Sequence, residues 1–226
     1  TGLQCRFQAD CLSRLSPDIY QYSVWGRSLR NAKKACEDLS SKGLEIKLAT
    51  DLEEGVKKAD IIIIALPTPL TKYLTPDLSY IKACLKSIKP FIKKGQLISL
   101  ESTTYPGTSE EIIGEFLKNE KFNLSEDFFL VYSPERISPE LKVKDKKIRY
   151  NLNNTPKVCS GYSKKCRELG RLLYKNIVNK VVLATSLKIA ETTKMIENIF
   201  RSVNIALVNE LKMFLTKVDI DINETL

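Results

Sequence analysis

The sequence predicts an α/β fold: a doubly wound, Rossmann-like sheet of parallel strands followed by one long helix. Segments with the spacing of strands and segments with the spacing of helices alternate along most of the chain, as in doubly wound sheets. Residues 61–66 form an unbroken aliphatic run, which is typical of a central parallel strand buried on both faces. Residues 187–218 contain no Gly and no Pro, and their apolar residues recur at a helical period.

The alternation can be followed element by element from residue 19. Strands are predicted at residues 19–25, 44–49, 61–66, 96–101, 128–132, 157–159 and 180–183. Helices are predicted between them at residues 29–41, 51–58, 78–92, 109–117, 164–174 and 187–218. Residues 1–18 show no strand alternation, helical face or Gly-rich turn, and the polar, Lys-rich residues 137–154 are expected to be irregular.

Several helix starts carry capping residues. Asp51 and Glu54 have the spacing of a capping box, and Ser186 is the expected N-cap of the last helix. About thirty residues at roughly 1.5 Å each make that helix about 45 Å long. We expect such a helix to join two domains or to pair with a second copy of itself.

The composition narrows the classes of function. The chain has 226 residues and a net charge of +9, from 36 Lys+Arg and 27 Asp+Glu. Its lysines are spread along the chain, which favours a solvated surface over a site for an anionic ligand such as a nucleotide or for nucleic acid. It has no His, and its six cysteines form no Cys-x-x-Cys pair, so no metal site is predicted. No apolar run approaches the roughly 20 residues of a membrane span, and no signal segment is recognisable. We therefore expect a cytoplasmic protein without a membrane partner.

Candidate site residues follow three of the predicted strands. Pro67 and Thr68 end the first, Thr103 follows the second, and Glu135 and Arg136 follow the third. The carboxyl ends of parallel strands meet at one edge of a sheet, so these turns should converge there. The hydroxyl groups and the following helix start would suit a phosphate or an oxyanion, and the carboxylate would suit a base. Plain strand ends, helix caps and surface groups are the simpler interpretations.

The long helix carries a polar stripe between its apolar positions. Lys194 and Asn198 are four residues apart and therefore share one face. A cation beside an amide can stabilise a developing oxyanion. From the spacing alone, a solvated stripe remains the simpler interpretation.

Four longer segments carry a family resemblance. They are ADIIIIALPTPLTKYLTPDLSYI, LESTTYPGTSEE, VYSPERISPE and SLKIAETTKMIENIFRSVNIALVNEL. In this order they resemble the UDP-glucose/UDP-N-acetylhexosamine 6-dehydrogenase family, and most closely its branch acting on UDP-N-acetylglucosamine or UDP-N-acetylmannosamine. The resemblance covers about residues 45–226.

The resemblance implies an NAD-dependent enzyme. It would oxidise the C6 alcohol of a UDP-N-acetylhexosamine to the uronic acid in two hydride transfers, through a covalent thiohemiacetal and a thioester. Such products are precursors of surface polysaccharides. The partners implied are a UDP-sugar substrate and a second copy of the chain, in a homodimer formed through the long helix.

The resemblance also implies roles for particular residues. Pro67 and Thr68 match the turn on the cofactor side. Thr103 matches a catalytic and cofactor-binding residue, which positions water near the dinucleotide and the reacting carbon. Glu135 and Arg136 match substrate-binding residues of the Ser-Pro-Glu turn, and Glu135 also matches a catalytic residue. Two further catalytic, substrate-binding residues are Lys194 and Asn198, which match the pair that binds the C6 oxygen as charge develops.

Several positions depart from the family pattern. Residues 1–18 lack the Gly-x-Gly-x-x-Gly turn that holds a pyrophosphate. The strand predicted at residues 19–25 ends in Trp25-Gly26-Arg27-Ser28 rather than in an acid. Arg27 is therefore a candidate cofactor residue that would suit a 2′-phosphate, so that NADP remains open beside NAD. Pro139-Glu140 stands where the family usually has Pro-Gly.

None of the six cysteines has the Gly-rich setting of the family's nucleophile. We therefore expect a fragment that is inactive alone, with the C-terminal domain missing. Residues 1–184 would be the dinucleotide-binding domain, and residues 185–226 the linker and dimerisation helix. Two alternatives stay open: an NADP-dependent dehydrogenase of the same superfamily acting on a simple hydroxy acid, and a decayed, non-catalytic copy that only dimerises.

Overall fold

The computed structural model describes residues 22–24, 29–40, 46–136, 155–175 and 178–225. The strands are β1 (Tyr22–Val24), β2 (Ile46–Leu48), β3 (Ile61–Ile64), β4 (Leu97–Leu100), β5 (Phe129–Tyr132), β6 (Lys157–Gly161) and β7 (Val181–Leu183). The helices are α2 (Leu29–Ser40), α3 (Leu52–Lys58), α4 (Ser79–Ile88), α5 (Glu115–Asn119), α6 (Lys164–Lys175), α7 (Leu187–Lys217) and α8 (Ile222–Thr225), with a π-helical turn η1 (Ser109–Gly114) directly before α5. The α/β fold class is confirmed; the expectations for residues 1–18 and 137–154 lie outside the described residues.

The main sheet has the order β3-β4-β5-β6-β7, and β1 and β2 form a separate parallel pair. Strands β3, β4 and β5 are parallel, but β6 runs antiparallel to β5. The prediction of parallel strands throughout was therefore wrong at this pair. Apolar spacing identifies a strand but not its direction, and an antiparallel neighbour needs no crossover helix.

The reversed strand brings a lysine to the edge where β5 ends. In the register of this pair, Tyr132 lies opposite Ser160. Lys157 is the first residue of β6, three positions before Ser160. It therefore lies beside the turn that follows β5.

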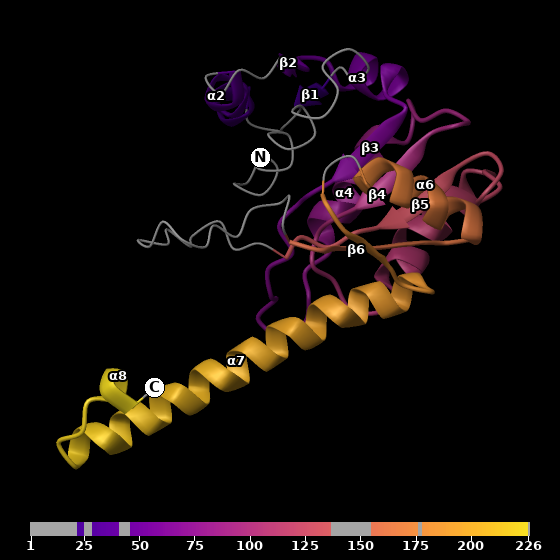
Figure 1. The fold of residues 1–226 in the computed structure, drawn as a ribbon. Coiled ribbons are helices and arrows are strands. Elements are labelled where there is room, and N and C mark those ends of the chain that lie inside the picture. Colours follow the sequence, from indigo (N-terminus) through magenta and orange to yellow (C-terminus); the bar gives the residue numbers. More distant parts are fainter. Residues whose placement is uncertain (1–21, 25–28, 41–45, 137–154, 176–177, 226) are drawn as a thin grey trace.

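Helices cover both faces of the sheet (Figure 1). On one face, α3, α4, η1, α5 and the first turns of α7 pack on Ile98, Leu100 and Leu130. On the other face, α6 places Tyr174 against Leu97 and its neighbours in β5 and β6. Adjacent residues of β4 thus point into opposite cores, which is why β4 is buried along its whole length.

Helix α7 packs on the domain only through its beginning. The Ser186 hydroxyl accepts a hydrogen bond from Ile189 N at 3.3 Å, so the predicted N-cap is confirmed. The buried residues of α7 are Leu187, Ala190, Glu191 and Lys194. The remainder of the helix extends away from the sheet (Figure 1). None of the helices in the described ranges is both long enough and apolar enough to span a membrane.

Two glycines should respond oppositely to substitution by alanine. A Cβ on Gly161 would meet Arg167 N at 2.3 Å and the Cys166 carbonyl carbon at 2.5 Å. These are backbone atoms of α6, so Gly161→Ala should lower the free energy of unfolding by about 1–3 kcal/mol. In α3, a Cβ on Gly55 would meet only Ala49 Cβ at 3.6 Å, so Gly55→Ala should raise it by about 0.5–1 kcal/mol. Urea unfolding measures both, and shifts of the same sign would contradict this packing.

Candidate functional site

The turns after β3 and β4 are joined by hydrogen bonds. The Thr68 hydroxyl donates to Thr103 O at 2.6 Å. The Ser102 hydroxyl donates to Leu66 O at 2.8 Å and accepts from Leu66 N at 2.9 Å. Pro67 is exposed, and Thr68 and Thr103 are half-buried. Three of the four predicted cofactor-side residues therefore lie together; the fourth, Arg27, lies outside the described residues.

Glu135 lies in the turn after β5 and is buried. Its Oε1 accepts a hydrogen bond from Arg136 N at 2.8 Å. The Ser133 hydroxyl donates to Val158 O at 2.8 Å, which fastens this turn to β6. The Ser-Pro-Glu-Arg turn is therefore held by the sheet rather than free at the surface.

A buried ionic cluster adjoins this turn. Lys157 Nζ lies 3.3 Å from Glu101 Oε2 and 3.7 Å from Glu135 Oε2. The Tyr174 hydroxyl donates to Glu101 Oε1 at 2.5 Å and lies 2.7 Å from the Ser99 hydroxyl. The two carboxylates raise the pKa of Lys157 above its ordinary value, although burial alone would lower it. The cluster therefore holds a buried cation.

Lys157 and Glu101 were not among the candidate residues recognised from the sequence. Nothing in the spacing along the chain relates them, because they come from β6 and from the end of β4. One signal was available: a lysine within the short apolar segment predicted at residues 157–159 needs a carboxylate if the strand is central and buried.

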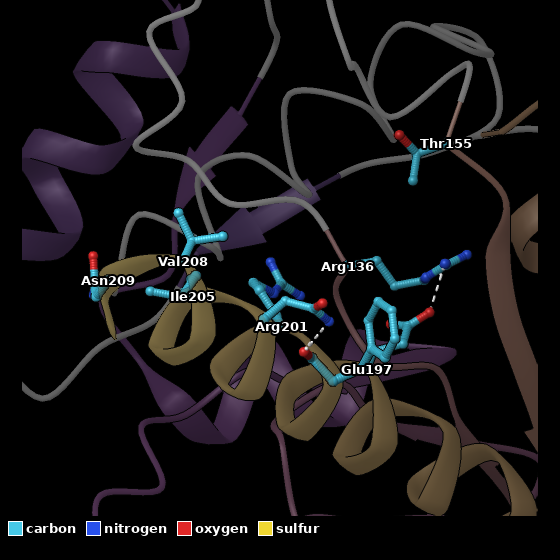
Figure 2. Close-up of a pocket in the computed structure, with 9 residues that line it drawn as sticks. Arg136, Thr155, Glu197, Arg201, Ile205, Val208 and Asn209 are labelled. Atoms are coloured by element: carbon cyan, nitrogen blue, oxygen red, sulfur yellow. Dashed lines mark hydrogen bonds and ion pairs between the residues drawn. The ribbon is translucent and has the colours of Figure 1, made fainter. Parts of the chain in front are cut away.

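Arg136 joins the end of β5 to α7. Its Nη1 donates to Pro156 O at 2.8 Å, and its Nη2 lies 2.5 Å from Glu197 Oε1 (Figure 2). Both side chains of this ion pair are half-buried, with exposed fractions of 30% and 26%. The pair therefore fastens the third turn of α7 to the turn that carries Glu135.

Lys194 lies on α7 one turn before Glu197 and is only 9% exposed. Its pKa is lowered, mainly by burial and then by the positive charge of Arg201, against opposing effects of Glu197 and Glu135. The structure thus brings Lys194 within electrostatic range of Glu135 and Arg136. Asn198 is half-buried one turn further along the helix.

A second attachment of α7 is made by Glu191. Its buried carboxylate accepts hydrogen bonds from Gly107 N at 2.5 Å, Ser109 N at 2.8 Å and the Ser109 hydroxyl at 2.7 Å. From the sequence, this helix start was considered for a phosphate or an oxyanion, with a helix cap as the simpler interpretation. In the structure the Glu191 carboxylate occupies it, as the simpler interpretation implies.

A pocket of about 610 Å³ opens along α7 beside Arg136 (Figure 2). It is lined by Arg136, Thr155, Glu197, Phe200, Arg201, Asn204, Ile205, Val208 and Asn209. Two guanidinium groups, two amides, one hydroxyl group and the Glu197 carboxylate line it together with apolar side chains. Because Glu197 is paired with Arg136, one positive charge remains in excess, and such a lining suits an anionic ligand that also carries a ring.

The Cys159 thiol, in β6, is not activated as a nucleophile. Burial raises the pKa of the Cys159 thiol to about 12, so it is not a thiolate at neutral pH. Within the described ranges, no group of three or more Cys, Asp or Glu residues is arranged to hold a metal ion. The site combines the carboxylate of Glu135, the hydroxyl groups of Thr68 and Thr103, and the buried ammonium groups of Lys157 and Lys194. Such groups can move a proton and stabilise a negatively charged oxygen.

Comparison with family models gives two matches. The NAD binding domain of the UDP-glucose/GDP-mannose dehydrogenase family matches residues 30–178. The central domain of the same family matches residues 188–226.

Curated relatives agree with these matches. Protein CapL of Staphylococcus aureus is 41% identical, over 78% of this chain and 41% of its own length. The UDP-N-acetyl-D-glucosamine 6-dehydrogenase of Pseudomonas aeruginosa is 38% identical over 78% of this chain and 42% of its own length. The UDP-N-acetyl-D-mannosamine dehydrogenase of Methanocaldococcus jannaschii is 32% identical over 92% of this chain and 49% of its own length. The chain thus spans less than half the length of these relatives.

Solved structures share the fold. The UDP-N-acetyl-mannosamine dehydrogenase Cap5O from Staphylococcus aureus has a TM-score of 0.67 at 31% identity, over 99% of this chain and 50% of that one. The UDP-D-ManNAc dehydrogenase from Pyrococcus horikoshii has a TM-score of 0.77 at 26% identity, over 96% of this chain and 53% of that one.

Replacing Glu191 by glutamine should favour the folded state increasingly as the pH rises. Burial is the main reason that the pKa of Glu191 is raised above its ordinary value of 4.5. The unfolded chain therefore loses this proton at a lower pH than the folded chain, and the natural chain loses stability across that interval. Glutamine has no such proton. The free energy of unfolding of Glu191→Gln, relative to the natural chain, should therefore increase from about pH 4 to about pH 7.

Urea unfolding at a series of pH values measures this difference. Glu210→Gln, at an exposed position of the same helix, is the matched control. A relative stability of Glu191→Gln that changes with pH no more than that of the control would contradict the prediction.

Proposed function

Because the chain belongs to the UDP-glucose/GDP-mannose dehydrogenase family, we propose that it is the NAD-binding part of a UDP-sugar 6-dehydrogenase. The enzyme would oxidise the C6 alcohol of a UDP-N-acetylhexosamine to the uronic acid, a precursor of surface polysaccharide. Two of the relatives are named as dehydrogenases of such sugars. The observation that carries the proposal is the gathering of Glu135, Arg136 and Lys194 where β5 meets α7.

We assign the cofactor to the edge where β3 and β4 end. Dinucleotides lie across the carboxyl ends of parallel strands in this kind of sheet. Thr68 and Thr103 stand at two such ends, linked by a hydrogen bond, with Pro67 exposed beside them. NAD, when bound, accepts the hydride that leaves C6. The case for NADP rests on Arg27, and the matching family model is described as an NAD binding domain.

We assign the binding of the C6 oxygen to Lys194 and Asn198. As the alcohol loses its proton, negative charge develops on that oxygen. A poorly solvated ammonium group interacts with such charge much more strongly than one in water. Lys194 is buried. The hydrogen bonds accepted by Glu191 and the ion pair of Glu197 with Arg136 hold the surrounding turns of α7 in place.

Glu135 and Thr103 are assigned to the water that supplies the second oxygen of the carboxylate. Glu135 would act as the base, and Thr103 would position the water. Arg136 would contact the substrate from the same turn. The covalent thiol steps implied by the resemblance are not assigned to Cys159, because its pKa of about 12 keeps the thiol protonated.

Residues 1–184 would form the dinucleotide-binding domain, and residues 185–226 the linker and dimerisation helix. The exposed apolar residues of α7 support this division. They form one stripe along the helix, with Ile196, Ile199, Phe200, Val203, Leu207, Leu211 and Phe214 each at least 42% exposed. A continuous apolar stripe of this length is typical of an interface. We propose that it is covered by the same stripe of a second copy.

Calorimetric titration with NAD⁺ and NADP⁺ tests the cofactor assignment. The chain should bind NAD⁺ at least about tenfold more tightly than NADP⁺. Thr68→Val removes the hydrogen bond to Thr103 O and should weaken NAD⁺ binding about threefold to tenfold, the effect of about 1 kcal/mol. Thr216→Val, which removes an exposed hydroxyl that donates to Lys212 O, is the control. Binding of neither dinucleotide would contradict the proposal.

Sedimentation velocity tests the proposed interface. The natural chain should sediment as a dimer, and the double variant Val203→Asp/Leu207→Asp as a monomer, because burying two carboxylates without partners costs several kcal/mol. Asn209→Asp adds charge at an exposed position on the other side of α7 and should leave the dimer intact. A monomeric natural chain would exclude this interface.

A further inference from the structure

The buried ammonium group of Lys157 is not used by the proposed chemistry. Lys157 is 4% exposed, and Glu101 and Glu135 are 2% and 5% exposed. They come from three neighbouring places in the sheet: the start of β6, the end of β4 and the turn after β5. The Lys157 ammonium group lies between the carboxylates, 3.3 Å from one and 3.7 Å from the other.

A simple structural ion pair would need only one of these carboxylates. Burying charged groups carries a large desolvation cost. Glu101 alone would balance the charge of Lys157. Glu135 is a second carboxylate that also accepts a hydrogen bond from Arg136 N, so it connects the Lys157–Glu101 pair with the turn after β5.

The Glu101 end of the cluster is anchored by the fold. Tyr174, from α6, donates to Glu101 Oε1 at 2.5 Å, and its hydroxyl also contacts that of Ser99 at 2.7 Å. Lys157 Nζ lies 4.9 Å from the centre of the Tyr174 ring, at the range of a cation–π contact. The position of the ammonium group is therefore set by side chains that lie under α6, away from the pocket.

The Glu135 end faces the candidate site. The negative charge of Glu135 reaches Lys194, whose pKa it raises against the larger effects of burial and of Arg201. Its neighbour Arg136 lines the pocket. Glu135 therefore interacts electrostatically with two ammonium groups, that of Lys157 inside the domain and that of Lys194 on α7.

We propose that Lys157 is a positioning residue, whose ammonium group, anchored by Glu101, holds the Glu135 carboxylate toward the candidate site. The role rests on the proposed function, because it is as a base that Glu135 needs a defined orientation. Lys157 itself contacts neither substrate nor cofactor in this proposal. It would keep the Glu135 carboxylate in one orientation before substrate binds.

The test observes the ammonium group directly. In the chain labelled with ¹⁵N-lysine, the ¹⁵N–¹H signal of Lys157 is identified by its loss in Lys157→Arg. If both carboxylates bind the group, Glu135→Gln should shift this signal and speed the exchange of its protons about tenfold, since each ion pair at this range is worth about one pKa unit or more. Glu101→Gln should do the same. Glu54→Gln removes the exposed partner of Lys58 and should leave the signal unchanged.

An unchanged Lys157 signal in a folded Glu135→Gln chain would overturn the inference, because Lys157 would then pair with Glu101 alone. If Glu135→Gln does not fold, Glu135→Asp withdraws the carboxylate by one methylene and decides in the same way. The outcome is independent of the dehydrogenase assignment. A chain that fails to bind NAD⁺ in calorimetry contradicts the proposed function, whereas a chain that binds NAD⁺ with an unmoved Lys157 signal contradicts only this inference.

Discussion

The carboxylate of Glu191 is the contact on which the arrangement of the site depends. It lies at the start of a long helix and accepts three hydrogen bonds from the turn after β4. Beyond Lys194 the helix has no buried residue, so this contact and the Arg136–Glu197 pair set its direction. Lys194 lies between these two contacts along the helix, and they set its distance from the end of β5.

The direction of β6 has a comparable effect on the other side of the sheet. A parallel β6 would carry Lys157 to the opposite edge, because the two ends of a strand of this length lie more than about 10 Å apart. The antiparallel pairing with β5 instead brings Lys157 next to Glu101 and Glu135. One reversed strand therefore converts three separated charged residues into a single buried cluster.

Much of the fold and part of the site could be predicted from local patterns. The aliphatic run of β3, the N-cap at Ser186 and the helical period of α7 depend on neighbouring residues, and such features can be recognised without knowing the fold. The meeting of Thr68 and Thr103 followed from the rule that parallel strands end at one edge. The anion at the start of η1 could not be foreseen in this way, because Glu191 is distant in sequence from Gly107 and Ser109.

The sequence by itself determined all the strands and all the helices except the short α8, together with the α/β class, the family resemblance and the residue types available for chemistry. These follow from periodicity, capping and composition, which are properties of short stretches of chain. Only the tertiary structure decided which charges meet: Glu191 with η1, Arg136 with Glu197, and Lys157 with two carboxylates. The physical reason is that a buried charge is tolerated only beside a partner, and partners are chosen by strand direction and helix packing.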